Sequence, residues 1–356
     1  MHRSFYDRHP RQVRDLPSGG VRIYLRFDGR RVACRGCGAV KTERLDWLAD
    51  NPHFTRRFAL YVGRLCREMT VKRVAALLHL TWHQVKDLEK QYMQAQLAKA
   101  PQPRPRAIGI DEVSRRKGHD YRVLVSDLDA ERPIWYGGTG RKEEDLDQFY
   151  AWLGPEKTAR LELAVMDMWK PFRNSTGKNG PHIRIIFDKF HVLRHLGEAL
   201  DDVRKSEYRR VSGKDRTFIK GQKYTLLSAR ANLNLEARQA LRKLLKANRR
   251  LNTTYLLKES FGQLWSYRRE GNARRFFENW RRQLRWQRLP SYEKFAAMID
   301  RHWDGIAAYC HPENKVSLGF VEGVNNKVRV IQRRAYGLRD EEYFRLKILT
   351  AFLPEL

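Results

Sequence analysis

Apolar and polar residues alternate along residues 20–33, GVRIYLRFDGRRVA, and an Asp-Gly pair interrupts the run. Alternation on both sides of such a pair predicts a β-hairpin. Further along, the apolar spacing becomes helical over residues 54–68, 71–78 and 82–92, and Thr81 stands where it would cap the third helix. Two short helices joined by a tight turn are typical of a helix-turn-helix, and the alternative is an ordinary three-helix bundle.

Short apolar runs after residue 106 predict five strands, with a helix at 143–153 between the third and the fourth. The predicted strands are residues 107–113, 121–128, 133–137, 161–166 and 183–187. The first three suit a meander, whereas the later ones need crossover connections. This order is that of the ribonuclease-H-like fold. We therefore expect an α/β core with a mixed five-stranded sheet and helices.

Helical spacing returns from Val192 to about His311, and no strand pattern interrupts it. Within it, residues 267–287 are basic on one side and aromatic on the other. This region predicts an all-α insertion into the core. The alternative for its basic side is a solvated face on a structural bundle.

The last predicted helix covers residues 318–335 and ends at Gly337. Gly319 and Gly323 would let it approach a sheet closely. Its apolar face carries Val321, Val324, Val328 and Ile331, and its polar face carries Glu322, Asn325, Asn326, Arg329 and Arg333.

These patterns divide the chain into six segments. They are a partial zinc-finger-like β-hairpin (1–50), a helix-turn-helix (51–98), a Pro-rich linker (99–106), the first part of the core (107–192), a basic helical insertion (193–316) and helices that complete the core (317–356).

Charge changes the interpretation of these segments. Lys and Arg number 71 against 41 Asp and Glu, so the 356-residue chain carries +30. Residues 1–106 and 193–318 are strongly basic, whereas residues 107–192 are neutral and rich in carboxylates. Basic flanks suit a polyanion such as DNA, and a carboxylate pocket between them suits divalent cations. A hydrophobic share of 42% excludes global disorder.

The sequence also bears on the compartment. No apolar run is long enough to span a membrane, and the N-terminal residues do not resemble a secretion signal. Four cysteines, two of them in one Cys-x-x-Cys, do not make a disulfide framework. We expect a cytoplasmic protein with no membrane partner.

Three carboxylates are candidates for chemistry on phosphates, because two-metal sites take carboxylates from several elements. Asp111 ends the first core strand, Asp167 ends the fourth, and Glu322 lies on the polar face of the last helix. The first and fourth strands are neighbours in a ribonuclease-H-like sheet, so both aspartates would lie on one rim.

Each of these carboxylates has rivals. Glu112 follows Asp111, but strand alternation turns it to the opposite face. Asp188 ends the fifth strand and is either a fourth carboxylate or a partner of His191, and Glu313 lies in a predicted loop. The ordinary alternative for a strand-end aspartate is a helix cap.

The motifs GIDEVSRRKGHDYRVLVSDLD, VMDMWKPF, IIFDKFHVLRH and FVEGVNNKVRVIQRRAYGLRD resemble the bacterial insertion-sequence transposases of the ISL3 family. The resemblance runs from about residue 9 to 350. It implies a DDE transposase with Asp111, Asp167 and Glu322 as a triad for two Mg²⁺ or Mn²⁺ ions. It further implies double-stranded DNA as partner, at transposon ends and target, a homodimer or larger assembly, and a place at the bacterial nucleoid.

Candidate DNA contacts lie on three predicted helices. The helix after Thr81 would present its polar side to the major groove, the arginine pairs of the insertion would follow phosphates, and the last helix would position the strand. These residues are Trp82, His83, Lys86, Lys90, Arg274, Arg275, Arg281, Arg282, Asn325, Asn326, Arg329 and Arg333.

Cys34 and Cys37 form half of a zinc knuckle directly after the predicted hairpin. Members of the family usually carry an earlier Cys-x-x-Cys that completes the finger, and this chain begins after the corresponding stretch. His2 and His9 are the nearest upstream candidates. The alternatives are therefore a zinc site with further ligands and two free thiols.

Two other functions fit the same patterns. A sequence-specific DNA-binding regulator would keep the fold without the chemistry. A ribonuclease-H-like nuclease would cleave DNA without joining it.

Overall fold

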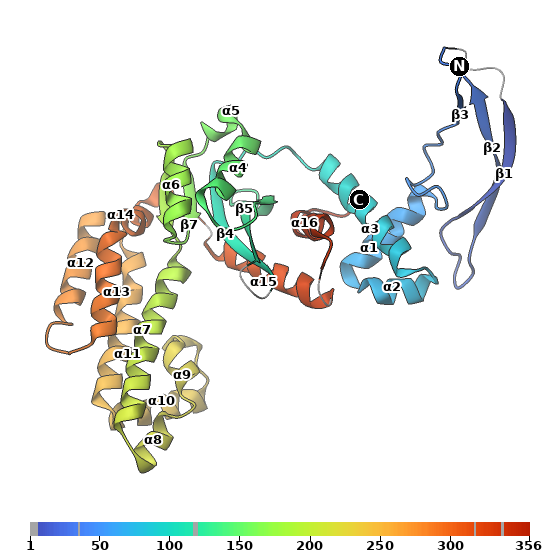
Figure 1. Ribbon diagram of the computed structural model, residues 1–356. Helices are drawn as coiled ribbons and strands as arrows, with labels where there is room; N and C mark the ends of the chain where they lie inside the picture. Colours follow the sequence, from blue (N-terminus) through green and yellow to red (C-terminus); the bar gives the residue numbers. More distant parts are fainter. Residues whose placement is uncertain (1–5, 35, 117–119, 317, 336–337) are drawn as a thin grey trace. The chain divides into compact units, whose positions relative to one another are not determined.

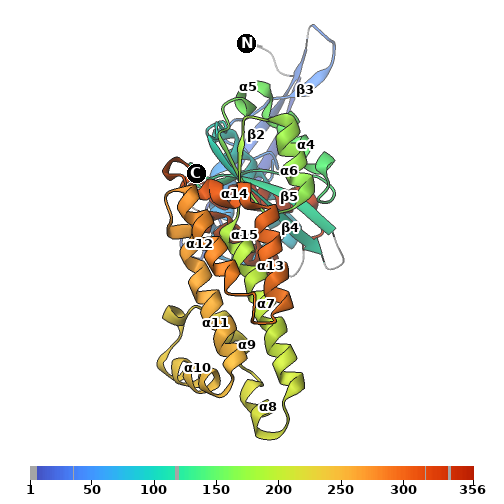
Figure 2. The same cartoon turned by 90° about the vertical axis from the view of Figure 1, so that its left-hand side faces the viewer.

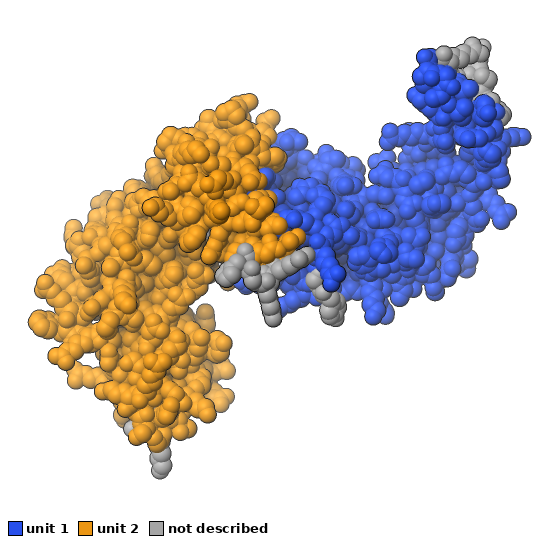
Figure 3. Space-filling view, in the orientation of Figure 1, with its two compact units in different colours: residues 1–103, 132–136, 324–356 blue, residues 104–131, 137–323 orange. Residues whose placement is uncertain are grey.

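The computed structural model describes residues 6–34, 36–116, 120–316, 318–335 and 338–356. Its contacts divide the chain into two compact units (Figure 3). Unit 1 comprises residues 1–103, 132–136 and 324–356, and unit 2 comprises residues 104–131 and 137–323. None of the helices in the described ranges is long and apolar enough to cross a lipid bilayer.

Unit 1 begins with an antiparallel sheet in the order β1-β2-β3 (Figure 1). Its strands are β1 (Asp7–Arg14), β2 (Tyr24–Ala33) and β3 (Val40–Thr42). The prediction of a hairpin within residues 20–33 is wrong. Asp28 and Gly29 lie inside β2, opposite Pro10 and His9 of β1. Alternation alone does not distinguish one long strand from two short ones, and the chain reverses earlier, near Gly19 with its φ of 58°.

Three helices follow: α1 (Arg56–Glu68), α2 (Val71–Leu78) and α3 (Trp82–Lys99). A threonine caps the start of each one through its side-chain oxygen, namely Thr55, Thr70 and Thr81. The third cap is reciprocal, because the side-chain oxygen of Gln84 in turn accepts a hydrogen bond from the backbone amide of Thr81. His79, in the left-handed region with φ 51°, ends α2 and makes the tight turn before α3.

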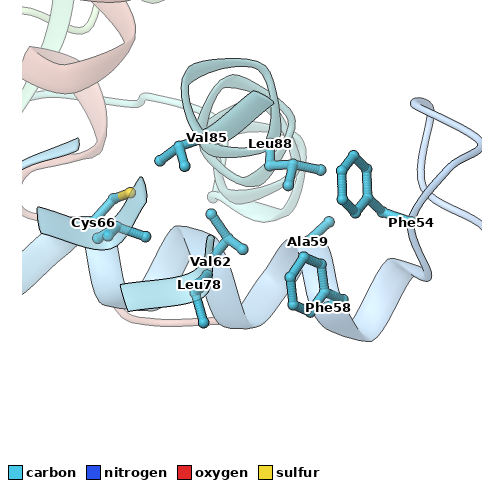
Figure 4. Packing of buried hydrophobic residues seen from close by; sticks show 9 residues of the cluster. Phe54, Phe58, Ala59, Val62, Cys66, Leu78, Val85 and Leu88 are labelled. Atoms are coloured by element: carbon cyan, nitrogen blue, oxygen red, sulfur yellow. The ribbon is translucent and has the colours of Figure 1, made fainter. Parts of the chain in front are cut away.

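A shared apolar core holds these helices together (Figure 4). Val62 of α1 and Val85 and Leu88 of α3 are completely buried in it. α3 continues beyond the predicted end at residue 92, and there Tyr92 and Met93 pack against α16 (Glu341–Thr350). The C-terminal helix is therefore part of the same unit as the three-helix motif.

The core sheet has the strand order β6-β5-β4-β7-β8, which contains the predicted meander of the first three strands. Its strands are β4 (Ala107–Arg116), β5 (Asp120–Asp127), β6 (Arg132–Gly137), β7 (Leu163–Met166) and β8 (Arg184–Phe187). β4 pairs antiparallel with β5 and parallel with β7, and β7 pairs parallel with β8. The sheet is thus mixed, and its first and fourth strands are neighbours.

Helices of unit 2 connect the strands and follow the sheet. Residues 189–314 contain helices and 3-10 turns and no strand. α7, α11, α12 and α13 lie side by side in this region (Figures 1 and 2). The α-helices are α4 (Glu143–Leu153), α5 (Pro155–Thr158), α6 (Lys170–Asn179), α7 (Lys189–Arg210), α8 (Gly213–Ile219), α9 (Lys223–Leu227), α10 (Leu235–Ala247), α11 (Arg249–Phe261), α12 (Glu270–Arg282), α13 (Pro290–Arg301) and α14 (Trp303–Ala307).

The last predicted helix is α15 (Leu318–Arg334), and the boundary between the two units falls within it. The sequence suggested that Gly319 and Gly323 let this helix approach the sheet closely, but the approach does not depend on them. A Cβ on Gly319 or Gly323 would meet nothing within 4 Å. The tight contact lies at Gly109 of β4, where a Cβ would come within 2.6 Å of Val321. The predicted end of this helix, Gly337, lies outside the described residues.

Candidate catalytic and DNA-contacting residues

Asp167 directly follows β7, as the sequence predicted, but Asp111 lies inside β4 and does not end it, because pairing with β5 extends β4 to Arg116. Gly109 of β4 is paired with Val165 of β7, and each aspartate follows its paired residue by two positions. Side chains two apart on a strand share a face. The register therefore places both carboxylates just beyond the last pair of the β4–β7 ladder. The sequence predicted that these two strands are neighbours, and they are.

The two aspartates differ in exposure but share an electrostatic environment. Asp111 is buried, and its Oδ1 accepts a hydrogen bond from the amide of Glu112 at 2.7 Å. Asp167 is half-buried, and its Oδ1 accepts from the amide of Met168 at 2.6 Å. His191 Nε2 lies 3.9 Å from Asp167 Oδ2. Burial acts to lower the pKa of His191, but a hydrogen bond with Asp188 and the charges of Asp167 and Asp111 outweigh it and raise that pKa.

Asp188 has a structural role in this cluster. Its side chain caps α7 by accepting from the amide of Phe190 at 2.9 Å. Its other oxygen lies 3.2 Å from His191 Nδ1. Of the two alternatives for Asp188, these contacts favour the partner of His191.

Strand alternation places Glu112 on the other face of β4, but the charges of Asp111 and Asp167 still act on its carboxyl group. Burial raises its pKa; Arg141 counters this, and the charges of Asp111 and Asp167 add to it. Arg141 Nη1 donates to Glu112 Oε1 at 3.1 Å. No sequence pattern singles out Arg141, because it lies in the connection between β6 and α4, where apolar periodicity gives no signal.

Glu322 is exposed on α15, directly after Val321, which is packed against Gly109. Within the described ranges it makes no ion pair or hydrogen bond. In the same ranges, no three His, Cys, Asp or Glu side chains converge closely enough to form a metal centre. The structure thus places Asp111 and Asp167 just beyond the β4–β7 ladder and brings the helix of Glu322 onto β4.

The predicted DNA contacts on α3 fall into two groups. Trp82 and His83, at the start of the helix, are exposed. Lys86 and Lys90 were expected to face outward, but both bind Asp340, with Nζ–Oδ2 distances of 2.7 and 3.3 Å. The packing of α16 on α3 brings Asp340, the residue that caps α16, to these lysines.

The basic pairs of α12 are also partly engaged. Arg274 and Arg281 both pair with Asp300 of α13, and Arg282 donates to Asn279. Arg275 is exposed and has no ion pair within the described ranges. Trp286, in the turn after α12, was not among the predicted contacts, and its 88% exposure is the highest among the large apolar side chains described.

The polar residues of α15 beyond Glu322 belong to unit 1. Asn326, Arg329 and Arg333 are exposed, and Asn325 is half-buried. Arg329 donates to Asn326 at 3.1 Å, one helical turn away.

Comparison with known proteins identifies the family. The sequence model of the ISL3 DDE transposases, described as a transposase, matches residues 108–348. A second model, the helix-turn-helix domain of transposase family ISL3, matches residues 43–93. The chain belongs to the ISL3 family of insertion-sequence transposases.

Curated relatives cover most of this transposase. It is 34% identical over 98% of its length to the transposase of insertion sequence element IS1001 from Bordetella parapertussis, and covers 86% of that protein. It is 27% identical over 95% of its length to the transposase of IS1557 from Mycobacterium tuberculosis, and covers 81% of that one. The match at residues 43–93 identifies the three-helix motif of unit 1 as a helix-turn-helix domain, and we therefore expect this motif to bind DNA.

A third model, the zinc finger of ISL3-type transposases, matches residues 2–37. Cys34 and Cys37 lie in a tight turn between β2 and β3, closed by the amide of Gly38 donating to the Cys34 carbonyl at 2.8 Å. Hydrogen bonds from Cys37 and the amide of Gly36 lower the pKa of Cys34, which favours a thiolate.

The other ligands of a tetrahedral zinc site do not come from the described residues. His9 is opposite Gly29 on the β1–β2 ladder and contacts Asp7 and Arg31 instead of the cysteines. His2 lies outside the described residues. Two thiols are half of the four ligands that structural zinc takes, so the described residues alone do not fit zinc.

Proposed function

We propose that this transposase cuts and rejoins the ends of its own insertion sequence by metal-dependent phosphodiester chemistry at Asp111, Asp167 and Glu322. The observation that carries the proposal is the register of β4 and β7, which carries both aspartates just beyond the last pair of their ladder. The packing of Val321 on Gly109 adds the helix of Glu322 to the same strand. The strand order supports a ribonuclease-H-like core, with the region after β8 as its helical insertion.

The donor set fits magnesium or manganese, because both prefer carboxylate oxygen. Asp111, Asp167 and Glu322 would hold the two ions. When bound, divalent ions would lower the pKa of a water molecule and neutralise charge on the reacting phosphate. The register and packing just described would supply the orientation, since β4 and β7 fix two of the three side chains through a rigid sheet.

The reaction has two displacements at phosphorus. In the first, water replaces the 3′ oxygen of one strand at the element end and leaves a free 3′-hydroxyl. In the second, that hydroxyl attacks a phosphodiester of target DNA and displaces its 3′ oxygen. Each step forms one P–O bond and breaks one, so no covalent bond to the enzyme is needed.

The DNA surfaces have separate tasks in this proposal. The helix-turn-helix binds the ends, with Trp82 and His83 as its exposed residues at the start of α3. Exposed arginines of α12, such as Arg275, bind phosphates without regard to sequence. Asn325, Asn326, Arg329 and Arg333 position the strand near α15. Because two ends must be joined, we propose a homodimer or larger assembly.

An assay on duplexes that span the boundary of the element tests this function. The full chain with Mg²⁺ should cleave at the boundary and join the product to a second duplex. Binding without cleavage would instead support the regulator, and cleavage without joining would support the nuclease. Inverted repeats, where the DNA flanking the gene carries them, would supply the substrate sequence.

A further inference from the structure

We propose that Arg141 binds the DNA phosphate beside the carboxylates and holds the strand for cleavage. This inference rests on the proposed function, because it places DNA beside Asp111 and Asp167. It adds a positioning residue that lies outside the carboxylate triad and outside the predicted DNA contacts.

The guanidinium of Arg141 lies over two aromatic rings. Its central carbon lies 4.9 Å from the ring centre of Tyr121 and 4.6 Å from that of Trp169. The indole nitrogen of Trp169 donates to the carbonyl of Arg141 at 2.8 Å, which ties the ring to the same connection. Stacking on aromatic faces is a property of arginine that lysine does not share. The group is therefore fixed in orientation before any ligand arrives.

One edge of this guanidinium is already used. Nη1 donates to both carboxylate oxygens of Glu112, at 3.1 and 3.4 Å. Nε and Nη2, which lie together on another edge, have no hydrogen-bond partner within the described ranges. The Arg141 side chain is 38% exposed, so solvent reaches part of it despite the two rings and Glu112. Two parallel N–H groups in a fixed fork match two oxygens of a phosphate.

The position of the cluster relates it to the candidate active site. Glu112, the partner of Arg141, follows Asp111 directly on β4. Trp169, one of the two rings, lies two residues after Asp167. The same few residues therefore carry the carboxylates and fix the guanidinium.

Charge gives this arrangement a purpose. Asp111, Glu112, Asp167 and Asp188 gather negative charge where a phosphodiester has to approach, and like charges repel. A rigid cation with a free fork offsets that repulsion and gives the strand one defined position. A purely structural arginine would need only the pair with Glu112.

The test measures how the affinity of the full chain responds to the loss of one phosphate charge. End duplexes carry a single neutral methylphosphonate at successive positions across the element boundary. Binding is measured in Ca²⁺, which carboxylates bind without the strict octahedral geometry that Mg²⁺ demands. Proteins are the wild type, Arg141→Ala, Arg141→Lys and the control Arg160→Ala, whose arginine is exposed and paired with Glu156 on α5.

We expect one phosphate at which neutralisation weakens wild-type binding about 10- to 100-fold, as for one charge-assisted contact. On unmodified DNA, Arg141→Ala should bind more weakly than the wild type by a similar factor. Neutralising that phosphate should then weaken the binding of Arg141→Ala by less than about twofold. Arg141→Lys, which keeps charge and loses the fork, should fall between, and Arg160→Ala should match the wild type. If the losses multiply at every position, or Arg141→Ala binds like the wild type, Arg141 does not hold a phosphate.

The same protein set separates this inference from the proposed function. Cleavage in Mg²⁺ by the wild type and not by Asp111→Asn supports the function whatever Arg141 does. If the methylphosphonate effect depends on Arg141 but Asp111→Asn cleaves fully, the phosphate contact is supported and the proposed catalytic site is contradicted. A thermal melt of Arg141→Ala excludes unfolding as the cause, and Arg141→Lys provides a second variant if it does not.

Discussion

Val321 of α15 occupies the space that a side chain on Gly109 of β4 would need. A Cβ at Gly109 would lie 2.6 Å from Val321 Cγ2 and 3.0 Å from Leu128 Cδ2. Gly109 precedes Asp111 by two residues, and Val321 directly precedes Glu322. One close contact between a strand and a helix thus relates two carboxylates that are more than two hundred residues apart in the sequence.

This contact predicts that Gly109→Ala impairs cleavage through α15. The added methyl group has to displace Val321, at a cost of roughly 1–3 kcal/mol in unfolding free energy. We expect cleavage to fall more than about tenfold, by displacement of Glu322, while DNA affinity is retained. Single-turnover cleavage and equilibrium binding, measured side by side, check this.

The double variant Gly109→Ala/Val321→Ala provides the matched test. Shortening Val321 makes room for the new methyl group, so cleavage should recover in part. Gly319→Ala is the control, because a Cβ there meets nothing. If Gly109→Ala cleaves like the wild type, the packing of α15 on β4 does not position Glu322.

The ends of the element should be distinguished by the exposed start of α3. Because Lys86 and Lys90 bind Asp340, we expect His83→Ala and Trp82→Ala to reduce the preference for end over random duplex. The loss should be roughly 1–3 kcal/mol at the affected base. Lys86→Ala should instead lower the melting temperature and change the end-to-random ratio by less than about twofold. Parallel titrations on both duplexes decide this. If the end-to-random affinity ratio changes only in Lys86→Ala, Lys86 and not Trp82 or His83 distinguishes the ends.

Binding to random duplex should fall steeply with salt. If six or more phosphates are contacted, a rise from about 50 to 200 mM salt costs on the order of a thousandfold in affinity. Removing the unpaired Arg275 together with Arg285 should flatten the slope. Removing Arg274 together with Arg281 should flatten it less, because Asp300 already engages both. Equal slopes for the two double variants would contradict this division.

Unit 1 should lose stability in acid through Asp15. This buried carboxylate accepts from Arg57 Nε at 2.6 Å and from Thr55 Oγ1 at 2.8 Å, and the hydrogen bond from Arg57 lowers its pKa to about 2. A lowered folded-state pKa stabilises the fold above the unfolded value, near 4, and this stabilisation is lost as pH falls toward 2.

We expect Asp15→Asn to cost roughly 1–2 kcal/mol of unfolding free energy at pH 7, a modest value because Arg57 is largely exposed. The difference from the wild type should shrink as pH falls from about 4 toward 2. Urea unfolding at several pH values measures it. Asp87→Asn, at an exposed position of α3, is the control, and a difference that is constant with pH would exclude the ion pair as its source.

Local patterns determined much of this fold in advance. The strands of the core and the neighbouring places of β4 and β7 follow from apolar spacing and from the crossovers that such an order requires. The cap at Thr81 follows from its residue type at the start of a helical pattern. The partner of β2 could not be deduced, because the alternation of residues 20–33 fits one strand as well as a hairpin. Tertiary pairing with β1 decided between the two.

Side-chain partners were the least predictable part of the candidate site. Asp111 and Asp167 are identified by the apolar strand runs that precede them, although β4 continues beyond Asp111. The pair of Lys86 with Asp340 instead joins residues from distant segments, and no periodicity relates them. Arg141 was missed for the same reason, since its stacking on Tyr121 and Trp169 exists only once the sheet is formed.

The most direct test of the account measures strand cleavage and joining on a labelled boundary duplex in Mg²⁺. It compares the wild type with Asp111→Asn, Asp167→Asn and Glu322→Gln, each of which removes one anionic oxygen at nearly constant volume. We predict that each variant loses several orders of magnitude in rate and still binds the duplex, and that chelation of the metal has the same effect on the wild type. Cleavage at the wild-type rate by any of the three variants would contradict the proposed site.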